Sequence, residues 1–484
     1  MRQPGPLIPA AIGAGLFTAA AIAGPLIAAG GVLAVGLAAV IYLLPVVGLA
    51  FMLASGTVLQ VLGSEHISGL PLSLNKIAAA MTLAVWGART VLLRIPLTWS
   101  PQMPAVLGFL LAVVVAGLGS PDPAESMDGL VRYIQVALLM VMIANIAGES
   151  ARALDLSCIA FTASMTASAL LGLMEFLLPS LAIEYDDPSL LQGNIGAVID
   201  RDSLDGVEIK RVTGGLGDSN WFGYTLAASL PLNLYLFHRY AGTGVRLLIL
   251  GVAALQSVGI VLSFTRSAII AAGVSVIWLL IRKRLPLKPL LAAGIIGAAG
   301  MLAWNPAGLE RIYSTSYAQE GSTPIRTYML LGGWELIEAR PITGYGFAQY
   351  GSNFHGWLER QPDLPTFVEA WARELDKGVA TGEDRFEWVN AHNTFVQLWV
   401  EFGLPGMIAF AALYGFMLLD LRKAGRVGGP RVQLLADCLA ASAIGFLVSC
   451  AFGSLLLIKV AWIVTGFAAA LRRVALAEAA GAPP

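Results

Sequence analysis

The sequence predicts an all-α polytopic membrane protein with about 12 transmembrane helices, and three observations lead to this prediction. First, 57% of the 484 residues are hydrophobic and only 13% are charged, with a mean hydropathy of +0.74, a profile that ordinary soluble domains do not have. Second, apolar stretches of roughly 17–25 residues, the length of a bilayer-spanning helix, recur from end to end. Third, clusters of lysine and arginine alternate with these stretches, as they do at the cytoplasmic ends of membrane helices.

The basic clusters fix the expected order of helices. They lie at Arg89/Arg94, Arg239/Arg246, Arg282–Arg284, Arg422–Arg431 and Arg472/Arg473, and we place these positions on the cytoplasmic side. The predicted spans are Leu72–Leu93, Met103–Leu118, Leu130–Ile146, Ile159–Leu178, Trp221–Phe237, Leu247–Val261, Ser267–Ile281, Leu290–Trp304, Phe395–Leu419, Leu434–Cys450 and Leu455–Leu471. Met1–Leu62 adds one to three more. We read its start as a retained helix, although the small residues near Ala19–Ala29 also fit a signal peptide.

Two segments interrupt the apolar pattern, and both fall on the extracytoplasmic side by this order. We therefore expect a bundle over residues 1–304 with a short polar segment at 179–219, a large loop over 305–392, and further helices and a short cytoplasmic tail over 393–484. The large loop is too long to be structureless in a compact protein, so helices are predicted at Tyr328–Ala339 and Thr366–Lys377. Its tryptophans either stack on sugar rings or lie at the membrane interface, and the sequence leaves both roles open. These residues are Trp334, Trp357, Trp371 and Trp388.

Arg266 is the residue that most strongly suggests a functional site. It lies in the block Ser263–Ser267, between apolar runs at Leu247–Leu262 and Ala268–Ile281. A charge in that place costs several kcal/mol unless it faces a polar cavity or an anionic partner. The alternative is an interfacial arginine whose guanidinium reaches lipid headgroups.

Further polar residues fall where an outward-facing cavity could collect them. Arg211 precedes a glycine-rich turn whose amides could approach a ligand, and Asp218-Ser219-Asn220 predicts a cap for the next helix. An arginine beside a helix N-terminus suits a diphosphate, and Arg326 adds a cation from the large loop. His392 directly precedes the helix at Phe395, where a neutral imidazole could accept a proton from a hydroxyl group. A capping role for His392 is equally compatible with its position.

Several chemistries have no support in the sequence. The net charge of −1 gives no reason to expect a nucleic-acid partner, and no phosphate-binding loop, zinc motif or serine nucleophile elbow is present. The three cysteines fall inside apolar helices and are expected to be buried small hydrophobes. We predict no cofactor and no metal; the acidic pairs Asp186-Asp187 and Glu383-Asp384 read as solvated turn residues, with a divalent-ion site as the alternative.

Four blocks resemble those of the bacterial O-antigen ligase and O-antigen polymerase superfamily. They are Arg211–Gly215 leading into Asp218–Trp221; Ser263–Ser267, in which Thr265 and Ser267 replace the usual serine and glycine; Arg326 and Trp334 with Pro341–Gly346; and His392-Asn393 followed after nine residues by Gly403–Gly406. The resemblance covers the C-terminal two-thirds of the chain and implies a C-type glycosyltransferase fold in the bacterial inner membrane.

The resemblance implies an inverting, metal-independent glycosyl transfer at the periplasmic face. Arg211 and Arg266 would hold the diphosphate of an undecaprenyl-diphosphate-linked glycan, and His392 would orient or deprotonate the acceptor hydroxyl. Substrate-binding roles are expected for Arg326, Asn393, Asn220 and Tyr345, and membrane lipids surround the bundle. The acceptor would be lipid A-core in a ligase, a lipid-linked glycan in a polymerase, or a protein side chain. A lipid-linked glycan flippase is the non-enzyme alternative, because it too would place arginines in a polar cavity.

Overall fold

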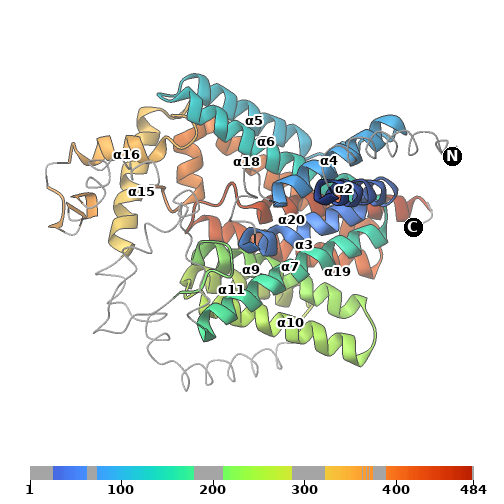
Figure 1. Cartoon of the computed structure of the whole chain (residues 1–484). Helices are drawn as coiled ribbons and strands as arrows, with labels where there is room; N and C mark the ends of the chain where they lie inside the picture. The colour runs from blue at the N-terminus through green and yellow to red at the C-terminus, as the bar shows by residue number, and fades with distance from the viewer. Residues whose placement is uncertain are drawn as a thin grey trace, which may run out of the picture. The chain divides into compact units, whose positions relative to one another are not determined.

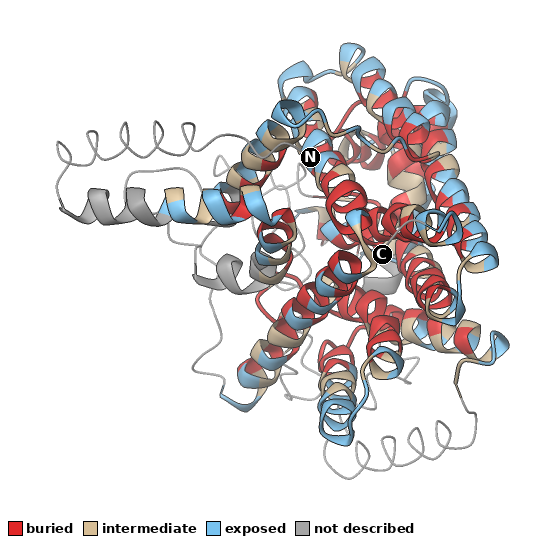
Figure 2. Ribbon diagram, turned by 90° about the vertical axis from the view of Figure 1, so that its right-hand side faces the viewer, coloured by how far each residue is buried: buried red, intermediate tan, exposed pale blue. Residues whose placement is uncertain are grey.

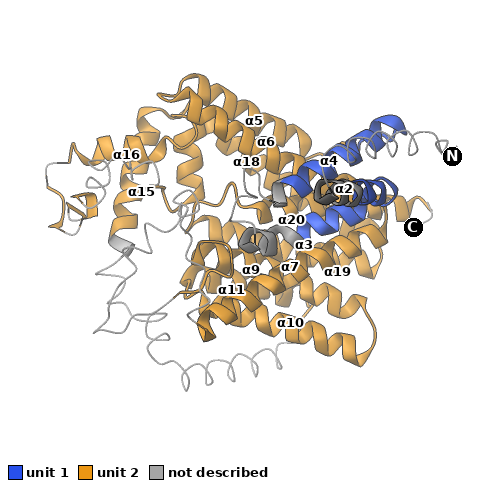
Figure 3. Cartoon of the chain, viewed as in Figure 1, with its two compact units in different colours: residues 1–97 blue, residues 98–484 orange. Residues whose placement is uncertain are grey.

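The computed structural model describes residues 25–62, 74–178, 211–285, 322–361, 363–366, 368–369, 371–373 and 389–481. These residues form α-helices and one short 3-10 helix and contain no strand, which confirms the predicted all-helical class (Figure 1). The chain divides into two compact units, residues 1–97 and 98–484 (Figure 3). The acidic pairs, Trp388 and the span predicted at Leu290–Trp304 lie outside the described residues.

The first unit contains three described helices, α2 (Pro25–Leu43), α3 (Pro45–Leu62) and α4 (Leu74–Leu92). α2 and α3 meet at Leu44 with a bend of 116°. Pro45 explains the bend, because proline donates no backbone hydrogen bond and disfavours helical geometry in the residue before it. α4 lies within two residues of the range predicted at Leu72–Leu93.

The second unit is a bundle built around the C-terminal helices. Its helices are α5 (Met103–Leu118), α6 (Pro123–Ile146), η1 (Ala147–Glu149), α7 (Ala151–Leu177), α9 (Ser219–Arg239), α10 (Thr243–Leu262), α11 (Arg266–Ile281), α15 (Ser322–Ala339), α16 (Tyr350–Leu358), α18 (Thr394–Val427), α19 (Pro430–Cys450) and α20 (Lys459–Ala479). α19 packs against α9, α11 and α18, and α20 packs against α6 and α18. Buried residues line the inward faces of these helices (Figure 2).

Length and hydropathy qualify six described helices as candidate membrane spans: α6, α7, α10, α18, α19 and α20. The bent pair of α2 and α3 would make seven, and α4, α5 and α11 include shorter apolar helices. The described residues therefore support a polytopic membrane protein. The total of about 12 spans stays a prediction.

The start of α7 corrects one predicted boundary. The apolar pattern places the helix start at Ile159, but the helix begins about two turns earlier, at Ala151, where the Ser150 hydroxyl oxygen accepts a hydrogen bond from the Ala153 amide at 3.1 Å. The polar residue Asp155 lies in the part of α7 that precedes the predicted start. It is buried, with only 2% of its surface exposed.

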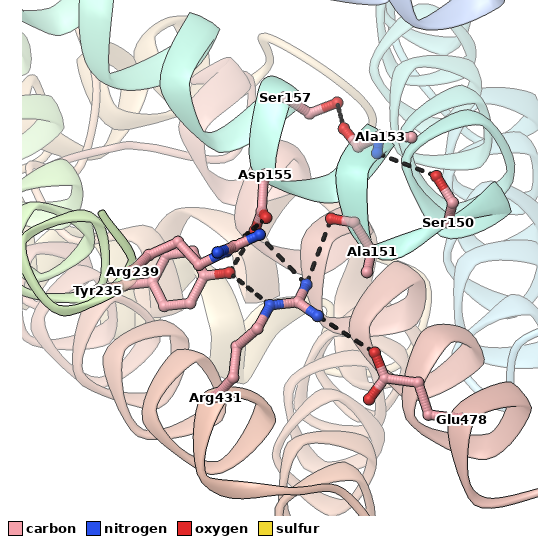
Figure 4. A network of polar contacts seen from close by, with 9 residues as sticks. All are labelled: Ser150, Ala151, Ala153, Asp155, Ser157, Tyr235, Arg239, Arg431 and Glu478. Carbon is pink, nitrogen blue, oxygen red and sulfur yellow. Dashed lines mark hydrogen bonds and ion pairs between the residues drawn. The ribbon is translucent and has the colours of Figure 1, made fainter. Parts of the chain in front are cut away.

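Asp155 is the centre of a buried ion-pair network (Figure 4). Its carboxylate pairs with Arg239 at 2.8 Å and with Arg431 at 3.4 Å, and it accepts a hydrogen bond from the Tyr235 hydroxyl. Arg431 also pairs with Glu478 at 3.1 Å. The network joins the start of α7, the end of α9, the start of α19 and the end of α20.

Two more buried aspartates form similar pairs at helix ends. Asp437 of α19 binds Arg282 and Arg284, which follow α11, at 2.8 and 2.7 Å. Asp420 of α18 pairs with Arg472 of α20 at 3.3 Å. The arginines in these pairs belong to the clusters that we predict to be cytoplasmic. Because α9 has 21 residues, its opposite end lies about 30 Å from this ion-paired end.

α18 is broken at Gly403, a feature that the predicted continuous helix at Phe395–Leu419 missed. Gly403 has φ 63° and ψ −167°, outside helical geometry, and Pro405 cannot donate a helix hydrogen bond. The carbonyls of Val400 and Glu401 accept hydrogen bonds from the amides of Tyr345 and Gly346, both at 2.9 Å. The Leu404 amide in turn donates to the Pro341 carbonyl at 2.9 Å. The Pro341–Gly346 stretch therefore satisfies the backbone groups that the break releases.

The described part of the large loop is helical and has its own apolar core. α15 matches the helix predicted at Tyr328–Ala339 but begins earlier, and the residues described between 366 and 373 are helical as expected. α16 was not predicted. The core includes Phe354, Trp357 and Trp371, so these two tryptophans are packing residues, whereas Trp334 is 54% exposed.

Candidate functional site

The candidate site lies around the start of α9, at the end of that helix opposite Arg239. Residues 211–218 lead into α9, and the break between α10 and α11 lies beside them. α11 begins at Arg266, and the interruption predicted at Ser263–Ser267 is confirmed. The break turns at Phe264, which is buried and has φ 48°, the left-handed region that non-glycine residues rarely adopt. The helix interruption leaves the Ser263 carbonyl and the Thr265 hydroxyl available to other partners.

Arg211 donates hydrogen bonds to both the Ser263 carbonyl and the Thr265 hydroxyl. Its Nε donates to the Ser263 carbonyl at 3.1 Å, and its Nη2 donates to the Thr265 hydroxyl at 2.9 Å and to Asn220 Oδ1 at 2.8 Å. Asn220 thus acts on the orientation of Arg211, whose guanidinium is fixed on one side against the helix break. Arg266 is the residue immediately after Thr265, so Arg211 binds the same helix break at which Arg266 begins α11.

The glycine-rich turn after Arg211 has a partner that the sequence analysis missed. Glu175, near the end of α7 and 6% exposed, accepts hydrogen bonds from the amides of Thr213, Gly214 and Gly215 at 2.7, 3.1 and 3.3 Å. The expectation that these amides approach a ligand is therefore wrong, because a protein carboxylate already occupies them. The sequence did contain one sign of this role, because Glu175 is an acidic residue near the end of the otherwise apolar span predicted at Ile159–Leu178.

Asp218 caps α9, as predicted. Its carboxylate accepts a hydrogen bond from the Trp221 amide at 2.7 Å. Burial raises the pKa of Asp218, while the Trp221 amide and the charges of Arg211 and Arg326 act in the opposite direction. Arg326 of α15 therefore lies within electrostatic reach of the start of α9, although the two are far apart in sequence.

The charge of Arg326 also acts on His392. Burial, and after it the positive charge of Arg326, lowers the pKa of His392 from 6.5 to about 3. The residue has φ 44° and remains partly exposed, and its amide donates to Asn390 Oδ1 at 3.0 Å. The imidazole is thus neutral near pH 7 and can accept a hydrogen bond, but it is a weak base in this state.

Asn393 has a structural role at the start of α18. Its Oδ1 accepts hydrogen bonds from the amides of Phe395 and Val396 at 3.0 and 3.1 Å, and its Nδ2 donates to the Ala451 carbonyl at 3.1 Å. Asn393, rather than His392, is therefore the cap of this helix, and it ties His392 to the link between α19 and α20.

The same link reaches the start of α9. The Tyr224 hydroxyl lies 2.6 Å from the Ser267 hydroxyl and donates to the Phe452 carbonyl at 3.4 Å. Neither Tyr224 nor Ser267 was singled out from the sequence as a site residue. Contacts and electrostatic effects therefore link five residues at one end of the bundle: Arg211, Asp218, Tyr224, Arg326 and His392.

Tyr345 lies elsewhere. It is 7% exposed and belongs to the core of the large loop, and the Arg340 guanidinium lies over its ring at 4.5 Å. Its environment is that of a packing residue. The cysteines are buried and free, as expected, and within the described ranges no group of three or more His, Cys, Asp or Glu could hold a metal ion.

The fold and the site together define a multi-pass helical protein with a polar, arginine-containing site at one end of its bundle. Residues 251–411 match the family model described as O-antigen ligase. This match covers about a third of the chain and supports the O-antigen ligase and polymerase superfamily that the four sequence blocks predict. It includes Arg266, Arg326 and His392, whereas Arg211 and Asn220 precede it. A comparison with curated proteins found no match.

Proposed function

We propose that the protein is a glycosyltransferase of the O-antigen ligase type, working at the periplasmic face of the bacterial inner membrane. It would transfer a glycan from undecaprenyl diphosphate to a hydroxyl group of lipid A-core, with inversion at the anomeric carbon and without a metal. The observation that carries this proposal is the position of Arg211 and Asp218 at the start of α9, within reach of the Arg326 charge, which also acts on His392.

In the proposed reaction, arginines stabilise the leaving group. The acceptor oxygen bonds to the anomeric carbon as the bond from that carbon to the phosphate oxygen breaks, and undecaprenyl diphosphate leaves with the electron pair. Arg211 and Arg266 bind the diphosphate, because a guanidinium matches two phosphate oxygens at once. Such preorganised donors stabilise the charge as it develops.

His392 orients the acceptor hydroxyl and receives its proton. In the absence of donor, burial and the added charge of Arg326 lower the pKa of His392 and keep the imidazole weakly basic. A diphosphate bound beside Arg326 would offset that charge and make His392 a stronger base. Donor binding would therefore prepare the histidine for the step in which it is needed.

Two other acceptors define the enzymatic alternatives. A polymerase would extend a lipid-linked glycan of an O-antigen or exopolysaccharide, and a protein O-oligosaccharyltransferase would modify a hydroxyl side chain. We favour the ligase because the His392-Asn393 block resembles that branch. A flippase is the non-enzyme alternative, and the folded cap of α15 and α16 with a histidine near the site supports an enzyme instead.

The test uses purified protein in liposomes with an undecaprenyl-diphosphate-linked glycan. Release of undecaprenyl diphosphate upon addition of lipid A-core supports the ligase; a longer lipid-linked polymer without lipid A-core supports the polymerase, and a glycosylated protein supports the third activity. Movement of intact donor between leaflets without release would refute an enzyme.

Two variants test the assigned residues. His392→Ala is expected to abolish turnover while donor binding persists, with His355→Ala in α16 as the matched control. Arg266→Lys is expected to lower kcat about a hundredfold, because an ammonium group cannot reproduce a bidentate contact. The control is Arg246→Lys at the ion-paired end of the bundle, and wild-type turnover in Arg266→Lys would support a lipid-facing arginine.

A further inference from the structure

Glu175 holds the backbone turn that follows Arg211. Its Oε2 accepts hydrogen bonds from the Thr213 and Gly214 amides at 2.7 and 3.1 Å, and its Oε1 accepts one from the Gly215 amide at 3.3 Å. The Thr213 hydroxyl also donates to Oε1, at 3.3 Å. Three successive amides of this kind form an anion-binding concavity, and here the anion is a side chain of the protein itself.

The same turn has a second contact with α7, through Ser168, and lies close to Phe222 of α9. The Ser168 hydroxyl donates to the Gly214 carbonyl at 2.6 Å. Gly214 has φ +55°, and a Cβ atom there would lie 2.2 Å from the Phe222 ring and 2.7 Å from the Ser168 carbonyl oxygen. Only glycine fits this place, because a Cβ would collide with both neighbours and the positive φ strains other residues.

The position of Arg211 depends on this turn. Arg211 lies two residues before Thr213, and the intervening residue Val212 is buried, with 1% exposed. The bonds of Arg211 to Ser263, Asn220 and Thr265 require its backbone to stay at a fixed distance from the helix break. A displacement of about 1 Å at such a site can reduce turnover about a hundredfold.

We propose that Glu175 is a positioning residue for the transferase: by binding the 213–215 turn, it fixes Arg211 in the orientation that stabilises the leaving diphosphate. This inference rests on the proposed function and adds a residue to it. Glu175 does not need to touch the substrate. Its carboxylate is engaged by protein amides, and an uncovered carboxylate near a diphosphate would oppose binding.

A double-mutant cycle tests this role. Glu175→Gln replaces one acceptor oxygen by an amide group that cannot accept the turn's N–H bonds. Glycan transfer in liposomes is measured for Glu175→Gln, Arg211→Ala and the double variant, with thermal unfolding recorded for each. Asp437→Asn is the matched control, because it makes the same acid-to-amide change at a buried site at the opposite end of the bundle.

We expect Glu175→Gln to lower kcat about a hundredfold and to add less than about threefold in the Arg211→Ala background, because the group through which it acts is already absent. Asp437→Asn is expected to lower the unfolding temperature while retaining near wild-type kcat. An undiminished effect of Glu175→Gln in the Arg211→Ala background, or wild-type kcat in the single variant, overturns the inference and leaves the proposed function standing.

If Glu175→Gln does not fold, Glu175→Asp takes its place in the cycle, since it keeps the carboxylate but shortens its reach to the amides of the turn. A loss of kcat that disappears in the Arg211→Ala background supports the inference. Wild-type kcat, or a loss that persists, overturns it. If the wild-type protein releases no undecaprenyl diphosphate with any of the three acceptors, the proposed function and this inference are refuted together.

Discussion

The low pKa of His392 predicts an unusual acid limb in the pH dependence of transfer. A histidine with a pKa of 6.5 is about 97% protonated at pH 5, whereas one with a pKa of about 3 is only about 1% protonated. Because the neutral imidazole is the form that can accept a proton, the wild-type protein should retain a competent His392 at pH 5. Its loss is expected only as the pH falls towards 3.

The variant Arg326→Gln separates the effect of the Arg326 charge on His392 from the effect of burial. Removing the charge eliminates the second cause of the lowered pKa and leaves burial, the larger one. The pKa of His392 should therefore rise but stay below 6.5, and the acid limb should move to higher pH. Arg340→Gln is the matched control, because Arg340 lies over the Tyr345 ring and is not among the causes that lower the His392 pKa.

The assay is kcat/KM for glycan transfer at limiting donor between about pH 2.5 and pH 8, which covers the acid limb expected near pH 3 and reports the groups of the free enzyme. The limb position is read from the shape of the profile, so a lower absolute rate in Arg326→Gln does not obscure it. A wild-type limb near pH 6.5 would refute the effect of burial and charge on His392. A limb that does not move in Arg326→Gln would refute the electrostatic link between the two residues.

Three further predictions concern the fold and the chemistry. Gly403→Ala should lower the free energy of unfolding by at least about 2 kcal/mol, since a Cβ would lie 2.0 Å from the Ile342 carbonyl oxygen in a backbone conformation that only glycine adopts readily; an unchanged thermal unfolding curve would contradict this. Asp155→Asn should destabilise the protein by about 1–3 kcal/mol, a range reduced because Arg239 and Arg431 are partly exposed, and transfer by the remaining folded protein should be normal. A chelator should leave turnover unchanged, because the proposed mechanism assigns the positive charge at the diphosphate to arginines, and strong inhibition would instead indicate a metal.

The membrane helices were largely predictable from local composition. Met103–Leu118 has the same bounds in the sequence analysis and in the structure, and Leu434–Cys450 differs only at its start. Apolar runs identify such helices because every backbone polar group in a bilayer must be bonded within the segment. The predicted starts of α7 and α19 were later than observed because charged residues in or near their first turns, Asp155 and Arg431, pair with other helices.

The candidate site was partly predictable. The interruption at Ser263–Ser267 and the Asp218 cap follow from residue types whose local preferences are strong. The partner of the glycine turn could not be found in this way, because Glu175 and Gly214 are far apart in sequence and meet only when α7 packs beside the turn. The break at Gly403 had a local signal in Gly403 and Pro405, but its compensation by Tyr345 and Gly346 is a tertiary contact.

The sequence by itself determined that the chain forms apolar helices separated by basic clusters, and that a few arginines and one histidine lie at their ends. These properties depend on hydrophobicity and on backbone preferences, which act over one helix at a time. Tertiary structure alone decided that Glu175 rather than a ligand binds the turn after Arg211, and that burial and the charge of Arg326 lower the pKa of His392. Both depend on electrostatic and hydrogen-bonding distances between helices, which are fixed only when the bundle packs.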